Sequence, residues 1–339
     1  MAILMQVFVL SQRVADVDRW SRSQLGEETV LLRELFEEEG HIFVQGMFVE
    51  LGALDGMGLS NTRTLQYALD WSGVLIEACP GHWPRLALRA SKLSRHQNVT
   101  VVQSAVCHPK PPGGTIRFSA KCRPGSAIHD GITHGDILMQ KERARETDEP
   151  IDVPCDGLGN ILESHGVSHV DMLSIDVEGY EVPLLQSIHW DKISVYAIVI
   201  EIDHNAPHEV DEIHTILSSA GFELVGLLAG DAIWVRPSAL ENSAGHWVKG
   251  NVTGTGWIGQ QKHPLVRPGL GLKPAFRALH ARRDALNMTT GFLRYVERVT
   301  LSLPLRGRVP PNLQLPPRPG GVIRGRAGGR GTRLDARTE

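Results

Sequence analysis

The segment at residues 48–56, FVELGALDG, places two carboxylates and two glycines directly after an apolar run. The residues that could contact a ligand there are Glu50, Gly52, Ala53, Asp55 and Gly56. Glycine has no Cβ, so a glycine turn lets the backbone approach a bound molecule closely. A phosphate-binding turn presents its amide groups to an anion, and the two carboxylates here would repel one. We therefore expect a cationic cofactor such as S-adenosylmethionine (SAM), with an ordinary strand-to-helix turn as the alternative.

Glu77 ends the next apolar run, about twenty residues beyond the glycine turn, where Rossmann-type sites place an acid against the ribose. A carboxylate suits this task because it accepts hydrogen bonds from both ribose hydroxyls. A third run ends in Gln103, Ser104 and Ala105, which are small or polar enough to lie beside an adenine ring. The alternative for Glu77 is a solvated carboxylate at a strand end.

The segment VDMLSIDVEGYE at residues 170–181 is a further apolar run, and it ends in Asp176 and Glu178. The carboxyl ends of parallel strands meet at one edge of a sheet, so these acids should join Glu50 and Glu77 there. Repulsion among four carboxylates indicates a cationic ligand, a metal or a catalytic task. The alternative is that the acids cap the helix that follows.

A general base is needed if the cofactor donates a group to a hydroxyl, and candidates follow the last two apolar runs. Asp176, Glu178 and His204 are the predicted catalytic residues, with Glu201 as a further candidate. The imidazole of His204 titrates near neutral pH, which suits a base, although a loop histidine is more often only solvated. The histidines and cysteines show no spacing typical of a metal site, so we expect no metal.

The elements that must position these residues alternate along the chain. Short runs rich in Val, Ile and Leu occur at residues 47–51, 74–77, 99–106, 172–175 and 197–202. Helical patterns occur at residues 60–71, 82–92, 158–165, 181–187 and 210–220. Continuous apolar strands that alternate with helices predict a doubly wound, mostly parallel Rossmann-like α/β sheet. Residues 222–228 and 232–236, on either side of Gly230 and Asp231, predict a terminal antiparallel hairpin.

The flanking segments carry weaker patterns. We expect one helix at residues 23–40 with the acids at 37–39 on its solvated face, and an insertion at residues 109–148. The expected division of the chain is an N-terminal segment, a catalytic domain, a partly helical extension and a disordered tail rich in Arg, Gly and Pro. Their bounds are 1–42, 43–236, 237–306 and 307–339.

Composition limits the classes of protein that remain. The 339 residues have a formal net charge of −3, which gives no electrostatic footprint for nucleic acid. No run approaches the roughly 18–20 apolar residues of a membrane-spanning helix. The four cysteines are too sparse for a disulfide framework, so we expect reduced thiols in a cytoplasmic protein. A single bridge and a location in the secretory pathway are the open alternatives.

The chain resembles the FkbM family of SAM-dependent methyltransferases, especially a branch common in eukaryotic proteins. The similar segments are FVELGALDG, LSNTRTL, DWSGVLIEACP and VDMLSIDVEGYE. The resemblance implies a methyltransferase that binds SAM and methylates a hydroxyl of a small molecule or a glycan. It also implies that Glu50, Gly52, Asp55 and Gly56 form the cofactor turn. Glu77 would hold the ribose, and Asp176 would lie beside the methionine end or the substrate.

Two departures and three rival functions accompany this resemblance. Ser174 stands where many members have lysine, and Cys79 stands where asparagine is more common.

The first rival is a non-catalytic protein that keeps the fold for binding or trafficking. A nucleotide-dependent oxidoreductase is the second, and Asp55 argues against it. A nucleic-acid methyltransferase is the third, supported by the Arg-rich tail alone.

Overall fold

The central sheet of the molecule contains seven strands in the order β12-β13-β11-β10-β4-β5-β6. The computed structural model describes residues 12–24, 26–93, 98–119, 122, 149–202, 205–228 and 230–254. The strands are β4 (Met47–Leu51), β5 (Ser72–Glu77), β6 (Val99–Gln103), β10 (His169–Ile175), β11 (Ser194–Glu201), β12 (Glu223–Leu228) and β13 (Asp231–Val235). Five of them run parallel, while β13 pairs antiparallel with both β11 and β12. The predicted doubly wound sheet with a terminal hairpin is confirmed.

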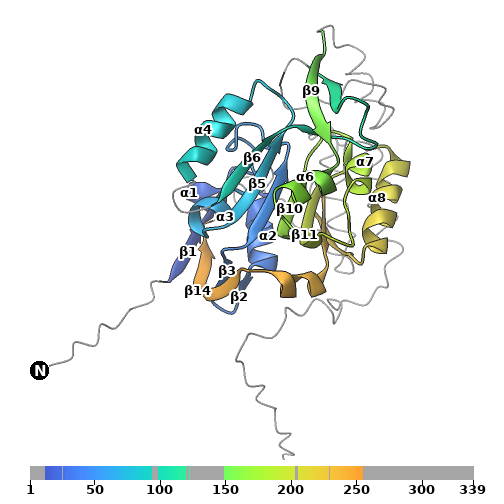
Figure 1. Cartoon of the computed structure of the whole chain (residues 1–339). Coiled ribbons are helices and arrows are strands. Elements are labelled where there is room, and N and C mark those ends of the chain that lie inside the picture. The colour runs from blue at the N-terminus through green and yellow to red at the C-terminus, as the bar shows by residue number, and fades with distance from the viewer. Residues whose placement is uncertain are drawn as a thin grey trace, which may run out of the picture.

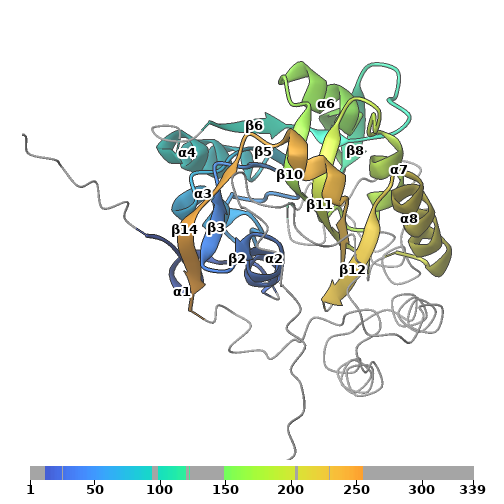
Figure 2. The ribbon, with the colours of Figure 1, turned by 90° about the horizontal axis from the view of Figure 1, so that it is seen from below.

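Helices cover both faces of this sheet, as Figures 1 and 2 show. The helices α6 (Leu158–Ser164), α7 (Glu181–Gln186) and α8 (Pro207–Ser219) pack on one face. The helices α2 (Glu27–Leu35), α3 (Arg63–Ala68) and α4 (Trp83–Leu93) pack on the other. Side chains alternate along a strand, so Val49 belongs to the first core and Phe48 to the second.

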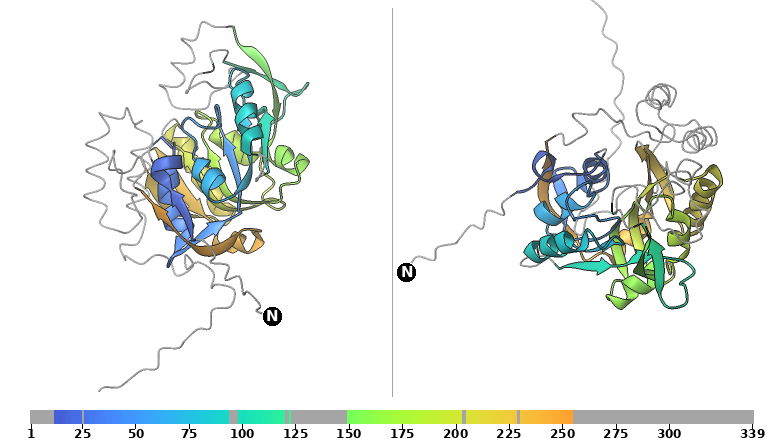
Figure 3. Two further views of the ribbon diagram at one scale, coloured as in Figure 1. Left: turned by 90° about the vertical axis from the view of Figure 1, so that its left-hand side faces the viewer. Right: turned by 90° about the horizontal axis from the view of Figure 1, so that it is seen from above.

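A second sheet joins the two flanks of the described chain, in the order β1-β14-β3-β2. Its strands are β1 (Arg13–Asp16), β2 (Glu37–Glu38), β3 (His41–Val44) and β14 (His246–Thr253). The left view of Figure 3 shows blue β1 and orange β14 together, away from green β9 (Ile151–Asp156). The short helix α1 (Val17–Trp20) packs against β14 of this sheet, whereas η1 (Pro237–Asn242) packs against β10 and β11 of the central sheet.

The prediction of one helix over residues 23–40 is wrong at its C-terminal end. Helix α2 ends at Leu35, and Glu37 and Glu38 pair antiparallel with Ile42 and His41. These acids are therefore half-buried in a strand, and the Oε1 of Glu37 accepts a hydrogen bond from the amide of Val252. Periodicity missed this because the pairing partners lie outside the window that a helical pattern samples.

A small third sheet lies beyond the carboxyl end of β6, in the order β7-β9-β8. Strand β7 (Ala105–Val106) directly follows β6 and pairs with β9, which also pairs with β8 (Thr115–Phe118). We call this sheet and its buried side chains the cap. The buried members are Cys79, Ala105, Cys107, Phe118, Val153, Cys155 and Tyr180.

Two disulfides, Cys79–Cys122 and Cys107–Cys155, hold the cap, with Cα–Cα distances of 5.5 and 5.8 Å. The expectation of reduced thiols is therefore wrong, because all four cysteines are paired. Their partners are 43 and 48 residues apart in sequence. Spacing alone could not reveal this pairing, because the turns of the fold bring the partners together.

Some expectations fall outside the described residues. These are the remainder of the 109–148 insertion beyond Cys122, the helical extension after residue 254 and the tail at 307–339. Within the described part of the chain, no helix has both the length and the apolar character needed to cross a membrane.

Candidate functional site

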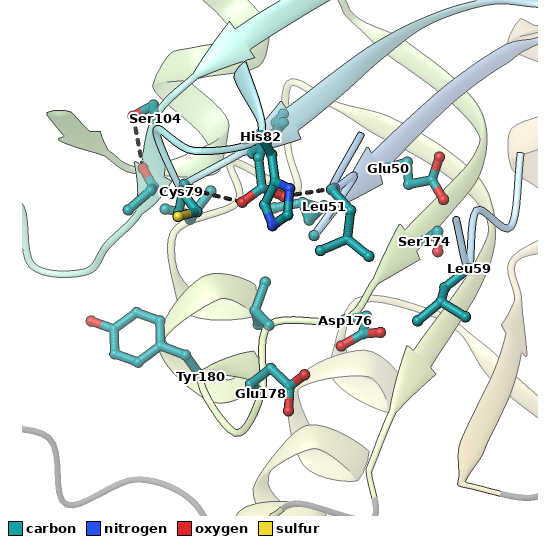
Figure 4. Close-up of a pocket in the computed structure, with 18 of the residues that line it drawn as sticks. Glu50, Leu51, Leu59, Cys79, His82, Ser104, Ser174, Asp176, Glu178 and Tyr180 are labelled. Atoms are coloured by element: carbon teal, nitrogen blue, oxygen red, sulfur yellow. Dashed lines mark hydrogen bonds between the residues drawn. The ribbon is translucent and has the colours of Figure 1, made fainter. Parts of the chain in front are cut away.

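A cavity opens where β4, β5 and β10 end, and the cap forms one of its walls. The space enclosed by its walls and open mouth together is about 900 Å³. Glu50, Glu77, Asp176 and Glu178 all line it, and Figure 4 shows three of them labelled. Among the described lining residues, His82 is the only basic side chain. The predicted convergence of strand-end carboxylates is therefore what the structure shows.

Glu50 joins the cavity to the loop before α3. Its carboxylate accepts hydrogen bonds from Ser60 Oγ at 3.0 Å, from the amide of Asn61 at 2.7 Å and from Thr62 Oγ1 at 2.6 Å. Burial raises the pKa of Glu50, and these hydrogen bonds oppose that shift. The side chain thus fixes the loop that carries Leu59 and Asn61 into the cavity.

Gly52 makes the turn after β4 possible. Its φ of +72° lies in the left-handed region, and a Cβ built there would collide with the backbone oxygen of Asp176. The glycine turn and the end of β10 are therefore in direct contact, with Ser174 in register opposite Glu50. Only a residue without a side chain permits this approach.

Glu77 fastens the other side of the glycine turn. Its Oε2 accepts from the amide of Leu54 and its Oε1 from the amide of Cys79, both at 2.7 Å. Burial raises the pKa of Glu77, while the two amides and the nearby His82 oppose that rise. Each carboxylate oxygen keeps a lone pair that a ribose hydroxyl could use.

We predict that Glu77→Ala weakens binding of S-adenosylhomocysteine by about 1–3 kcal/mol, through the loss of hydrogen bonds to the ribose. Isothermal titration calorimetry measures the affinity, and Glu241→Ala, an exposed acid away from the cavity, is the control. Circular dichroism must show a folded variant, because Glu77 also holds two backbone amides. Unchanged affinity in a folded Glu77→Ala protein would contradict the assigned pocket.

Most, but not all, of the predicted cofactor residues lie at the cavity. Those that line it are Glu50, Gly52, Glu77, Ser104, Ala105 and Asp176. Ser104 Oγ donates to the carbonyls of Ala105 and Pro154 at 2.8 and 3.0 Å, which ties the cavity wall to β9. Ala53 and Gly56 do not line the cavity. Ala53 is buried in the core, and Gly56 lies close to the side chains of Leu86 and Leu75.

Asp55 also does not line the cavity, contrary to expectation. Its carboxylate accepts from the amides of Met57 and Gly58 at 3.0 and 2.9 Å and forms an ion pair with Arg89 of α4. These contacts lower its pKa against the effect of burial. Asp55 is therefore a turn-stabilising residue, since its charge is already compensated by Arg89.

The predicted catalytic acids form a compact group. Carboxylate oxygens of Asp176, Glu178 and Glu201 lie within 4.8 Å of one another, and all three residues are half-buried. Carboxylates this close attract protons or cations because their charges repel. His204 lies outside the described residues, so its position is not known.

Several lining residues had no signal in the sequence. His82, Phe118 and Tyr180 reach the cavity from the β5–α4 turn, the cap and the turn before α7. Tyr180 is held by the backbone of His108, whose carbonyl accepts from its hydroxyl at 3.4 Å. These residues are hard to find because they come from separate turns with no fixed spacing.

The sequence model described as "Methyltransferase FkbM domain" matches residues 50–224. The chain belongs to the FkbM methyltransferase family. Members of this family use SAM, and the seven-stranded sheet with its antiparallel hairpin has the Rossmann-like methyltransferase arrangement. The cavity fits this cofactor, because carboxylates on an almost cation-free wall suit a sulfonium and an ammonium and would repel a pyrophosphate.

Solved structures of low sequence identity resemble the chain. The FkbM methyltransferase of Methylobacillus flagellatus KT is 14% identical, with a TM-score of 0.37 over 62% of this chain and 47% of that chain. A SAM-dependent methyltransferase of Aquifex aeolicus is 14% identical, with a TM-score of 0.32 over 62% and 89%. Fibrillarin of Aeropyrum pernix, solved with SAM, is 13% identical, with a TM-score of 0.31 over 63% and 74%. No curated protein sequence matches the chain.

Proposed function

We propose that this FkbM-family protein transfers the methyl group of SAM to a hydroxyl of a small molecule or a sugar. The supporting observation is the cavity itself, which combines a glycine turn, a ribose-side acid and the carboxylates of Asp176 and Glu178, with Glu201 close beside these two. A hydroxyl is a weak nucleophile, so a carboxylate that can take its proton favours oxygen as the acceptor atom.

The chain's own residues have separable tasks in this reaction. When bound, SAM supplies an electrophilic methyl group on its sulfonium. Glu77 would hold the ribose, while Gly52 and Asp176 would border the methionine end. The acceptor hydroxyl would attack the methyl carbon while the carbon–sulfur bond breaks, leaving S-adenosylhomocysteine. Its proton would pass to one of the three grouped carboxylates. The cap would exclude water, and fixed alignment of the two reactants supplies on the order of 7–11 kcal/mol in well-oriented systems.

The first test is binding and turnover by the unmodified protein. Calorimetry with S-adenosylhomocysteine should detect binding, and SAM with a radiolabelled methyl group should label a hydroxyl compound from an acceptor panel. Binding without labelling of any acceptor would favour the non-catalytic binding or trafficking alternative. Absence of binding to S-adenosylhomocysteine would contradict the proposal.

We predict that neutralising the base lowers turnover without abolishing cofactor binding. Three variants remove one carboxylate each and keep the side-chain size: Asp176→Asn, Glu178→Gln and Glu201→Gln. Loss of the residue that acts as the base should lower kcat by about 10²- to 10⁴-fold. Single-turnover methyl transfer measures this loss, and Glu241→Gln is the matched control outside the cavity. If all three variants kept full kcat, none of these carboxylates would be the base.

We also propose that the chain acquires its disulfides in an oxidising compartment, in place of the cytoplasm expected from its sparse cysteines. The two bridges support this, because structural disulfides rarely persist among cytosolic thiols. Mapping of disulfide-linked peptides in protein from its native cells tests it. Four free thiols in that protein would contradict the proposal.

A further inference from the structure

His82 belongs to the short turn that leads from β5 into α4. Its amide donates to the carbonyl of Cys79 at 3.1 Å, and Trp83 begins α4 directly after it. The imidazole lines the cavity, and Figure 4 shows it between Cys79 and Leu51. The Cys79–Cys122 disulfide fixes the turn further. The Sγ atom of Cys122 accepts a hydrogen bond from the amide of Gly81 at 3.4 Å. His82 is therefore held in the cavity wall by its backbone.

The Nε2 atom of His82 is buried and has no hydrogen-bond partner among the described residues. A buried polar atom left without a partner destabilises the fold, so such an atom in a cavity wall indicates that a ligand supplies the partner. The carboxylate of Glu77 is close enough for His82 to lower its pKa. No hydrogen bond joins Glu77 to Nε2 of His82, so Glu77 does not supply the missing partner.

The position of His82 selects one end of the cavity. In Figure 4, His82 lies on the same side as Cys79 and Ser104, while Asp176 and Ser174 lie on the other side. The first side carries Glu77 and the small residues Ser104 and Ala105, the expected surroundings of a ribose and its adenine. The second side carries Asp176, a member of the carboxylate group. A ligand bonded to His82 would therefore meet it with its nucleoside half.

We propose that His82 binds the ribose of SAM through Nε2, as the partner of Glu77 in recognising the two hydroxyls. A ribose hydroxyl both donates and accepts, whereas an ionised carboxylate only accepts. An imidazole nitrogen beside it adds a donor or a further acceptor according to its tautomer. Glu77 and His82 together satisfy more of the ribose than Glu77 alone. The inference rests on the proposed binding of SAM in this cavity.

The test measures the affinity of S-adenosylhomocysteine for wild type, His82→Ala and His82→Gln by calorimetry. Loss of one hydrogen bond should weaken His82→Ala by about five- to twentyfold, and His82→Gln, whose amide can donate or accept, should recover part of that loss. His208→Ala is the matched control, because His208 is exposed on α8 and does not line the cavity. It should bind as wild type does.

Nucleoside analogues separate contact from a structural role. The affinities of 5′-methylthioadenosine and of its 2′-deoxy and 3′-deoxy forms are measured for wild type and His82→Ala. If His82 bonds to a hydroxyl, its substitution should cost less than about twofold once that hydroxyl is missing. An equal loss for all three analogues would show that the substitution deforms the pocket, and would overturn the inference.

The outcomes distinguish this inference from the function on which it rests. Wild-type protein that fails to bind S-adenosylhomocysteine would contradict the proposed function. Wild-type protein that binds it, together with a His82→Ala variant of equal affinity, would overturn only the role of His82. A selective loss with analogues that keep one particular hydroxyl would support His82 and identify its partner atom.

Discussion

The Gly52→Val variant should lose at least about 100-fold in affinity for S-adenosylhomocysteine, the largest effect expected of any single substitution in the cavity. Left-handed backbone is costly for a β-branched residue, by about 1–3 kcal/mol, and Gly52 has a φ of +72°. The added Cβ would also collide with the backbone oxygen of Asp176. The turn and the end of β10 must then separate, which disrupts both walls of the cavity at once.

A second glycine separates backbone strain from this collision. Gly166 has a φ of +71°, and a Cβ there would meet no atom within 4 Å. Gly166→Val should therefore lower the melting temperature through strain alone and leave the affinity for S-adenosylhomocysteine unchanged. Calorimetry and thermal unfolding of both variants provide the comparison. Wild-type affinity in Gly52→Val would show that the cofactor does not depend on this turn.

Removal of the disulfides should be the largest stability effect. The cap has few buried side chains, and three of the seven are half-cystines, so the bridges replace a core that the cap lacks. Closing loops of 43 and 48 residues gives, in the chain-entropy account, on the order of 4 kcal/mol per bridge. Two double variants test this, one for each bridge. The midpoint of denaturant unfolding should fall when Cys107 and Cys155 are both replaced by serine, and also when Cys79 and Cys122 are.

The two bridges should differ in their effect on cofactor binding. The amide of Cys79 donates to Glu77 at 2.7 Å, so loss of the Cys79–Cys122 bond loosens the residue assigned to the ribose. The Cys107–Cys155 bond joins β7 to β9 within the cap and touches no assigned cofactor carboxylate. The first pair of serine variants should therefore weaken S-adenosylhomocysteine binding more than the second. Equal stability with and without a reductant would contradict the role of both bridges.

The central sheet was predictable from the sequence because its signal is local. A strand buried on both faces needs a continuous apolar run, and β4, β5 and β10 each have one. Glu50, Glu77 and Asp176 follow from the same logic, because the carboxyl ends of parallel strands share an edge. The flanking sheet was not predictable in this way, since β14 pairs with β1 and β3 from more than 200 positions away.

By itself the sequence determined the family, the parallel sheet and the strand ends at which carboxylates gather, because apolar periodicity and the segments around Glu50 and Asp176 are short-range patterns. Only the tertiary structure decided that Asp55 pairs with Arg89 instead of lining the cavity, and that His82 enters the cavity beside Glu77. It also decided the cysteine pairing that closes the cap. Each of these depends on the direction of a side chain after distant turns have packed together, which no spacing along the chain encodes.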